Sequence, residues 1–540
     1  MPTEPAIITA NTPEEALPDD IHALKQMVLT LLAQIDDLNG QLYYLKRQLF
    51  GKKSEKLNPA QRLLFEGLYE ELQAKLEAQQ AAETESEAEA PAPQAKKQPN
   101  AHHKGRNPLP ADLPREEIVI EPQPDEKICP ECHSEKERIG EEVTEKLEYI
   151  PASFHVKKYV RPKYACRLCQ GQVSIGDLPP MAIDKGIAGE GLLAHIITSK
   201  YADHIPLNRL EGILRRHGVD INVSTMCDWV RDCADLLRPL VKRMRELILD
   251  GPRINTDDTP VPVKSKKRKG STYNGYLWVY VGGPLDVGVP FYAGGRRYAV
   301  FDFTPTRSRH GPLHFLDTYG GCVQADAYSG YDEYFRTTKA TEVGCHAHAR
   351  RKFDYAMESD PVRACQMLVL WKDLYAVEQR AKEQHFSPEQ LLAARQDESK
   401  QILEKIHEKL IAWKDAVLPK SPTAKAIGYA LGQWEALLRY LDDPILEIDN
   451  NLAERTLRMV AIGRKNWQFA GSEAGAEWAA VIYSLVATCK LSGVDPFAYF
   501  RDVLGRISTH PASDIDTLLP PDWKPGTEPA AQSDPALTPA

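Results

Sequence analysis

A low-complexity stretch from residue 78 to residue 107, which includes AETESEAEAPAPQAKKQPN, limits how this chain folds. Its Ala, Glu, Pro, Gln and Lys residues bury too little apolar surface to offset the entropy of ordering, so we expect a disordered linker. The 540 residues also exceed what one hydrophobic core holds. The sequence therefore predicts a multidomain protein with about three or four separately folding units.

Composition and charge narrow the class of protein. With 42% hydrophobic and 26% charged residues, the chain has no apolar run near the roughly 18 residues of a membrane span. Residues 1 to 20 lack a secretory signal, so we expect a disordered N-terminus and a cytoplasmic protein with reduced cysteines. The net charge of -9 opposes a uniformly basic nucleic-acid surface. The local basic run from Lys264 to Lys269 is either a solvated loop or a phosphate contact.

A heptad repeat begins at residue 21. Two apolar series repeat every seven positions: Ile21, Val28, Ile35, Leu42 and Leu49 in one, and Leu24, Leu31, Leu38 and Leu45 in the other. This pattern favours a parallel coiled coil, so we expect residues 21 to 77 to contain a dimerisation helix followed by a basic segment. The alternative is a helix packed against its own chain. Lys52 and Lys53, in the FGKKSEKL segment, are candidate DNA contacts.

Two C-x2-C knuckles lie between residues 108 and 180. Cys129 and Cys132 form the first, and Cys166 and Cys169 form the second, among alternating residues that predict short strands. Four thiolates satisfy tetrahedral Zn²⁺ and leave no open position for a substrate, so we expect a structural zinc ribbon. A disulfide pairing is the alternative, which a reducing cytoplasm opposes.

Residues 187 to 250 have helical periodicity with a break at HGVDINVST. We expect one helix to end near Gly218 and a second to be capped by Ser224 or Thr225, which is helix-turn-helix geometry. A helical hairpin that does not bind DNA is the alternative. The candidate DNA contacts of this region are Arg215, Arg216, Ser224, Thr225, Asp228 and Arg231.

Five strand-like runs follow, namely RINTDDTPVPV, GYLWVYVGG, VPFYAGG, YAVFDFTP and GGCVQADAYSGY. Asp257 ends the first run and Asp326 ends the last, so we expect both carboxylates to project from neighbouring strand ends into one cleft. Glu454 would join them from a helix capped by Asp449 or Asn450. Three such acids suit two Mg²⁺ or Mn²⁺ ions, which activate a water or a 3'-hydroxyl at a phosphodiester. The alternative for any one of these acids, considered alone, is a cap or turn residue without a catalytic role.

The order of these motifs resembles the transposases of the insertion sequence 66 family across nearly the whole chain. The matching segments are FGKKSEKL, CPEC, CRLC, DDTPVPV, GYLWVYV, QADAYSGY, CHAHARRKF, DNNLAERTLR and GRKNWQFAGSEAGAEWAAVIYSLVATCKLSGVDP. The resemblance implies an RNase H-like catalytic fold with a D-D-E triad, which by motif is Asp257, Asp326 and Glu454. Asp258 stands where the family often has Glu and is not assigned as a ligand. The resemblance also implies a bacterial, nucleoid-associated protein and accessory proteins encoded by the same element.

The second and third acids are separated by 128 positions, more than a compact RNase H-like domain needs, which predicts a helical insertion. The expected architecture is multidomain α+β, with the catalytic domain at residues 251 to 354 and 446 to 510. The all-helical insertion occupies residues 355 to 445, and residues 511 to 540 form a C-terminal tail. We interpret the aromatic residues Trp371, Tyr375, Trp413 and Trp434 as core.

Basic and metal-ligating residues accompany the acids. The candidate strand contacts are Arg350, Arg351, Arg455, Arg458, Arg464 and Lys465. Cys345 and His348 have the C-x2-H spacing of a pair near the active site of some other D-D-E transposases. Because no Cys or His with matching spacing lies nearby in the sequence, we interpret this pair as structural and do not expect zinc there.

The sequence as a whole predicts a transposase that binds terminal inverted repeats in double-stranded DNA, dimerises, and performs two-metal hydrolysis and strand transfer. A catalytically inactive DNA-binding repressor of the element is the alternative, which the three intact acid motifs oppose. A zinc-dependent hydrolase is excluded, because a four-cysteine site is closed and the chain has no H-E-x-x-H motif.

Overall fold

A five-stranded mixed sheet is the frame on which the described part of the chain is built. The computed structural model describes residues 153–164, 174–183, 186–265, 270–284, 296–317 and 319–526. The predicted coiled coil with Lys52 and Lys53, the linker and the four knuckle cysteines lie outside these ranges, as does the VPFYAGG run. Of the predicted ribbon, the described strands are β1 (Lys163–Tyr164) and β2 (Ser174–Ile175), which pair antiparallel.

The central strand of the sheet is β3 (Arg253–Lys264). On one side, β4 (Thr272–Gly282) and β5 (Tyr298–Thr304) continue the sheet antiparallel; on the other, β6 (Cys322–Gln324) and β7 (Thr341–Val343) continue it parallel. The order is β5-β4-β3-β6-β7. Four of the predicted strand runs are confirmed. The β7 strand was missed because three residues are too few to show an alternating pattern.

The side chains of β3 alternate between two differently covered faces. Thr256 and Asp258 lie on one face, which is covered by α6 (His310–Leu316) and the 3-10 turn η4 (Ser329–Tyr331). The ring of Phe315 stacks there on Tyr280 of β4, with a centroid distance of 3.6 Å. Asp257 lies on the other face, which is covered by α14 (Asn451–Trp467).

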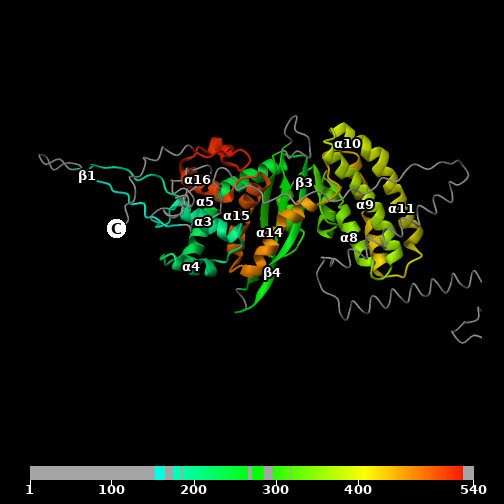
Figure 1. Cartoon of the computed structure of the whole chain (residues 1–540), viewed down its shortest axis with the longest axis horizontal. Coiled ribbons are helices and arrows are strands. Elements are labelled where there is room, and N and C mark those ends of the chain that lie inside the picture. The colour runs from blue at the N-terminus through cyan, green and yellow to red at the C-terminus, as the bar shows by residue number, and fades with distance from the viewer. Residues whose placement is uncertain are drawn as a thin grey trace, which may run out of the picture. The chain divides into compact units, whose positions relative to one another are not determined.

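The free edge of β5 is closed by α15 (Glu473–Leu491), which Figure 1 labels beside the green strands. The backbone N–H of Phe301 donates to Ser484 Oγ at 2.8 Å, and that of Ala299 donates to Thr488 Oγ1 at 3.0 Å. These hydroxyls satisfy donors that an edge strand leaves unpaired.

Within the described ranges, three helices precede the sheet: α3 (Glu190–Tyr201), α4 (Leu207–Arg216) and α5 (Val223–Leu249). The predicted break is confirmed, with Gly218 at φ +79° just after α4. The predicted caps are wrong, because Asn222 occupies the N-cap of α5 and Ser224 and Thr225 lie inside its first turn. The helix is also longer than a short hairpin arm, since its 27 residues continue into the core beneath β4 and β5.

The chain after α15 folds back onto α5. It forms α16 (Pro496–Arg506), followed by the short turns η7 (Ile507–Thr509) and η8 (Ala512–Leu518). Leu518 and Leu519 are buried, and Arg243 of α5 donates two hydrogen bonds to Asp516. Residues 511 to 526 are therefore part of the core assembly and not of the tail predicted from residue 511.

A group of helices follows β7 and builds a second hydrophobic core. Its members are α8 (His346–Ala356), α9 (Pro361–Glu383), α10 (Pro388–Ala394), the π-helix η5 (Arg395–Ser399), α11 (Lys400–Lys414), α12 (Pro422–Gly432), α13 (Trp434–Leu438) and η6 (Arg439–Leu441), while α7 (Asp332–Thr337) precedes β7. Figure 1 shows the larger ones in yellow-green. Trp371 is fully buried, and Trp413 and Trp434 pack against the same core, which confirms their interpretation as core residues.

Arg395 ties this helical group to the segment that returns to the sheet. Its guanidinium, 1% exposed, donates two hydrogen bonds to the carboxylate of Glu378 at 2.7 and 2.9 Å. It also donates to three backbone carbonyl oxygens, those of Tyr440, Asp443 and Leu446. Because these carbonyls precede α14, Arg395 helps to set where that helix begins.

We expect Arg395→Met to lower the free energy of unfolding of the helical group by about 3 to 5 kcal/mol, because it leaves Glu378 and the carbonyls without their partner. Chemical denaturation measures the loss. Arg380→Met is the matched control: its ion pair with Glu398 is exposed, so a change of about 0.5 kcal/mol or less is expected. Equal losses in both variants would contradict the anchoring role.

Candidate active site

Asp257 and Asp326 come together where β6 ends. Asp257 is the fifth of twelve residues in β3, so the prediction that it ends its strand was wrong. The strand continues because β4 still pairs with it, whereas β6 stops at Gln324, opposite Asn255. Extending the parallel register by two residues on each strand sets Asp257 beside Asp326. The sequence predicted that Asp257 and Asp326 would be neighbours because both strands end there, but only β6 ends at this point.

Glu454 approaches Asp257 from the first turn of α14. Asn450 occupies the N-cap of this helix without a side-chain capping hydrogen bond, and Asp449, one residue earlier, accepts a hydrogen bond from the backbone N–H of Asn451 at 3.0 Å. The half-buried Asp257 has its pKa raised to about 7, first by burial and then by the negative charges of Asp326, Asp258 and Glu454. The carboxylates of Asp257, Asp326 and Glu454, which are far apart in sequence, therefore lie close enough for their charges to interact.

A fully buried amide network connects the three elements that carry the acids. The side-chain amide of Asn255 on β3 donates to Gln324 Oε1 at the end of β6 and to Asn450 Oδ1 before α14, both at 3.1 Å. The amide of Asn450 donates in turn to the backbone oxygen of Thr256 at 2.8 Å. These amides lie two residues before Asp257, two before Asp326 and four before Glu454. This network, which sequence reasoning missed, fixes the acid-bearing segments relative to one another.

Asp258 points to the opposite face of the sheet and has a cation of its own. Arg307 donates three hydrogen bonds to its carboxylate at 2.7 to 3.0 Å, and the Asp258 side chain is only 4% exposed. Arg307 also lies 3.8 Å from Asp326 Oδ2 and over the ring of Tyr328. No motif pointed to Arg307 in the sequence. Its position explains how adjacent acids in one strand acquire different surroundings.

The CHAH segment at the start of α8 lies against the cluster. His346 is buried, with Nε2 at 3.0 Å from the backbone oxygen of Leu437 and Nδ1 accepting from Trp371 Nε1 at 3.2 Å, so its role is structural. Burial lowers the pKa of His346 to about 4. Cys345 Sγ accepts from the backbone N–H of Asn450 at 3.2 Å. His348 instead faces Glu454, with 3.6 Å between Nδ1 and Oε1.

The predicted DNA contacts differ in their surroundings. Arg351 donates to Glu454 Oε2 at 2.9 Å, while Arg350, Arg455, Arg458 and Lys465 are exposed on α8 and α14. Arg464 is used within the fold, because it donates to Thr259 Oγ1 at 2.7 Å and to the backbone oxygen of Pro260. In the helical hairpin, Arg215 pairs with Glu211 and Asp220, Arg231 pairs with Asp228 and Asp232, and Arg216 and Ser224 are exposed.

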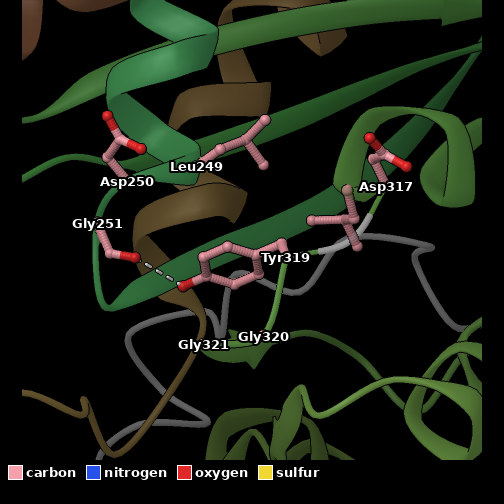
Figure 2. A pocket seen from close by; sticks show the side chains of 8 residues that line it. Leu249, Asp250, Gly251, Asp317, Tyr319, Gly320 and Gly321 are labelled. Carbon is pink, nitrogen blue, oxygen red and sulfur yellow. Dashed lines mark hydrogen bonds between the residues drawn. The ribbon is translucent and has the colours of Figure 1, made fainter.

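A pocket of about 400 Å³, shown in Figure 2, is separate from the acid cluster. It lies where α5 ends and β3 begins, and Tyr319 there donates from its hydroxyl to the backbone oxygen of Gly251 at 3.1 Å. The acids lie past the other end of β6.

None of the helices in the described ranges is long and apolar enough to cross a membrane.

The combination of a mixed sheet, converging acids and flanking basic residues is that of a DNA-processing protein, and family comparison identifies a transposase. The chain belongs to the family described as "Transposase IS66 family", which matches residues 185–478. Residues 126–170 match the "zinc-finger binding domain of transposase IS66", residues 37–118 "Transposase C of IS166 homeodomain", and residues 484–520 the "IS66 C-terminal element". The family predicted from motif order is confirmed. These matches indicate DNA-binding elements, and they point to structural zinc and a divalent metal ion.

Two similar proteins come from Sinorhizobium fredii (strain NBRC 101917 / NGR234). The chain is 34% identical to "Uncharacterized protein y4hP" over 443 residues, which cover 78% of this chain and 77% of that protein. It is 32% identical to "Uncharacterized protein y4jD" over 524 residues, which cover 94% and 98%. The similarity therefore extends through segments on both sides of the sheet.

We expect Asp257→Asn to stabilise the protein in magnesium-free buffer. Because the folded pKa of about 7 exceeds the unfolded value, the folded state binds an extra proton between about pH 4 and 7, and stability falls as pH rises through that window. The variant lacks this penalty, so at pH 8 it should gain about 1 to 2 kcal/mol and lose the gain near pH 4. Denaturant unfolding across pH measures both effects. A stability gain in Asp257→Asn that is equally large at pH 4 and pH 8 would refute the electrostatic explanation.

We expect Asn255→Leu to destabilise the protein by roughly 2 to 4 kcal/mol, because two buried amide oxygens lose their donor. The comparison is Asn274→Leu, an exposed position on β4, where roughly 0.5 kcal/mol or less is expected. Urea unfolding followed by tryptophan fluorescence distinguishes them. If both variants unfold at the wild-type midpoint, the amide network does not hold the elements together.

Proposed function

We propose that this transposase cuts and joins DNA strands at a site formed by Asp257, Asp326 and Glu454. The observation that carries the proposal is the convergence of these acids from β3, the end of β6 and α14, which the buried amide network supports. Clustered carboxylates repel one another, so a fold that brings them together at a cost needs cations to offset it. The family relationship supports the same conclusion.

The donor set fits hard divalent cations. All three side chains offer oxygen atoms, which Mg²⁺ and Mn²⁺ prefer. Glu454 Oε1 is buried and has no hydrogen-bond partner among the described residues, while the nearby Arg307 is engaged by Asp258. Asp257, Asp326 and Glu454 would therefore hold two ions. When bound, such ions supply an activated water or 3'-hydroxyl and stabilise the leaving oxygen.

The residues around the acids would orient the site and the DNA. Arg351 holds Glu454 through Oε2 and leaves the other oxygen facing the cluster. Asp326 and Glu454 remain 27% and 24% exposed, so a phosphodiester has access. Arg350, Arg351, Arg458 and Lys465 lie on α8 and α14 beside them and are proposed to contact phosphates. Arg464, which bonds β3, would act mainly by positioning α14.

The remaining parts of the proposal concern domain organisation. The strand order, with the first strand of the sheet in its centre, supports an RNase H-like catalytic fold interrupted by the helical group. We propose that residues 21 to 77 form the dimer, and that Cys129, Cys132, Cys166 and Cys169 hold structural zinc, as the zinc-finger match supports. With the α4–α5 region, which includes Arg215, Arg216, Ser224, Thr225 and Arg231, these parts would bind the terminal inverted repeats. Accessory proteins encoded by the same element would assist transposition.

We expect Asp257→Asn, Asp326→Asn and Glu454→Gln each to abolish nicking of a plasmid carrying the element's ends, because each removes a charged ligand. Binding of the ends, measured by gel shift, should stay within a few-fold of wild type. Asp302→Asn on β5 is the control, since its half-buried acid faces His314 and Arg245 instead of the cluster. Cleavage that persists in a triad variant would remove that residue from the site. Absence of cleavage in the wild type would favour an inactive repressor.

A further inference from the structure

Cys345, His348 and Glu454 form a group of a different chemical kind beside the carboxylates. Cys345 is the N-cap of α8, His348 lies in its first turn, and Glu454 lies in the first turn of α14. One potential ligand atom from each residue, a sulfur, a nitrogen and an oxygen, lies within 4.8 Å of the others. This group could not be predicted from local spacing in the sequence, because Glu454 is 106 positions after His348.

Two atoms of this group lack the partner that burial requires. His348 Nδ1 and Glu454 Oε1 are both buried, and neither has a hydrogen-bond partner within the ranges that the structure describes. They are 3.6 Å apart, too far for a hydrogen bond between them. Unpartnered buried polar atoms cost about 1 to 3 kcal/mol each. A metal ion between them would satisfy both.

We infer that Cys345, His348 and Glu454 form a binding site for a zinc-class transition metal ion, which inhibits the enzyme by engaging Glu454. The inhibitory consequence rests on the proposed function, whereas metal binding does not. Sulfur, nitrogen and oxygen donors suit Zn²⁺, while Mg²⁺ takes oxygen ligands. Three protein ligands leave the fourth tetrahedral position to water.

The local contacts decide which side chains take part. His346 is excluded, because both of its ring nitrogens are engaged. Arg351 holds Glu454 Oε2, so Oε1 is the oxygen available either to this site or to the ions shared with Asp257. Binding converts the Cys345 thiol to a thiolate and releases its proton to solvent, with no change of oxidation state. Zinc and magnesium would thus compete for one carboxylate.

Zinc binding is tested directly on the full chain. Zinc equivalents are measured by competition with a chromophoric chelator for wild type, Cys345→Ser and His348→Gln. Each variant should hold one equivalent fewer than wild type at low micromolar zinc, while the knuckle zinc stays. Cys227→Ser, an exposed thiol on α5, should match wild type. Equal zinc equivalents in wild type, Cys345→Ser and His348→Gln overturn the site. Because Cys345 is buried, circular dichroism checks the fold of each variant, and His348→Gln decides if Cys345→Ser unfolds.

Inhibition is tested by plasmid nicking at fixed magnesium with increasing zinc, each protein being compared with its own activity without added zinc. The zinc concentration for half inhibition should rise about tenfold or more in His348→Gln and remain unchanged in Cys227→Ser. An unchanged value in His348→Gln, with its zinc equivalent lost, overturns the inhibitory role. A wild type that never nicks refutes the proposed function, and the chelator titration then still decides whether the metal site exists.

Discussion

The buried hydrogen bonds between Asn255, Gln324 and Asn450 are the interaction on which the arrangement of the site depends. Breaking a hydrogen bond between buried amides leaves polar atoms unpaired at a cost, so these side chains tolerate little displacement of one element against another. Each amide lies within four residues of an acid. The rigidity of these hydrogen bonds is thereby transmitted to the segments that carry the three carboxylates.

That rigidity opposes electrostatic repulsion. Burial and the neighbouring negative charges raise the pKa of Asp257 to about 7, so the fold holds acids where ionisation is unfavourable. Strand alternation turns Asp258 to the other face, where burial also raises its pKa and the hydrogen bonds and charge of Arg307 offset part of that rise. Two adjacent aspartates in one strand thus acquire different neighbours, other carboxylates for Asp257 and a guanidinium for Asp258, from the alternation of the β-strand. A site strained in this way is suited to binding cations.

The helical group contributes to the site although its core is separate from that of the sheet. It carries α8, whose first turns present Cys345, His348 and Arg351 toward Glu454. Its return segment is held by Arg395 at one point and by Tyr375, whose hydroxyl donates to Asp449, at another. The long separation between the second and third acids therefore brings both a support for α14 and side chains that contact its glutamate.

Patterns in the sequence were enough to predict a helical insertion between the second and third acids, four of the strand runs, the aromatic core residues and the family, because each depends on local spacing or motif order. They also singled out three acids, whose convergence the structure shows and whose catalytic role stays a proposal.

Other features of the fold and the site depend on tertiary structure alone. Asp257 lies within its strand because β4 extends the pairing past β6, Asn222 and not Ser224 is the N-cap of α5, and β7 exists through pairing with β6. Arg307 and the amide network carry no local signature, since their partners lie tens to nearly two hundred residues away. Contacts between such distant residues form only when the chain is folded, so no pattern within a short window of sequence reveals them.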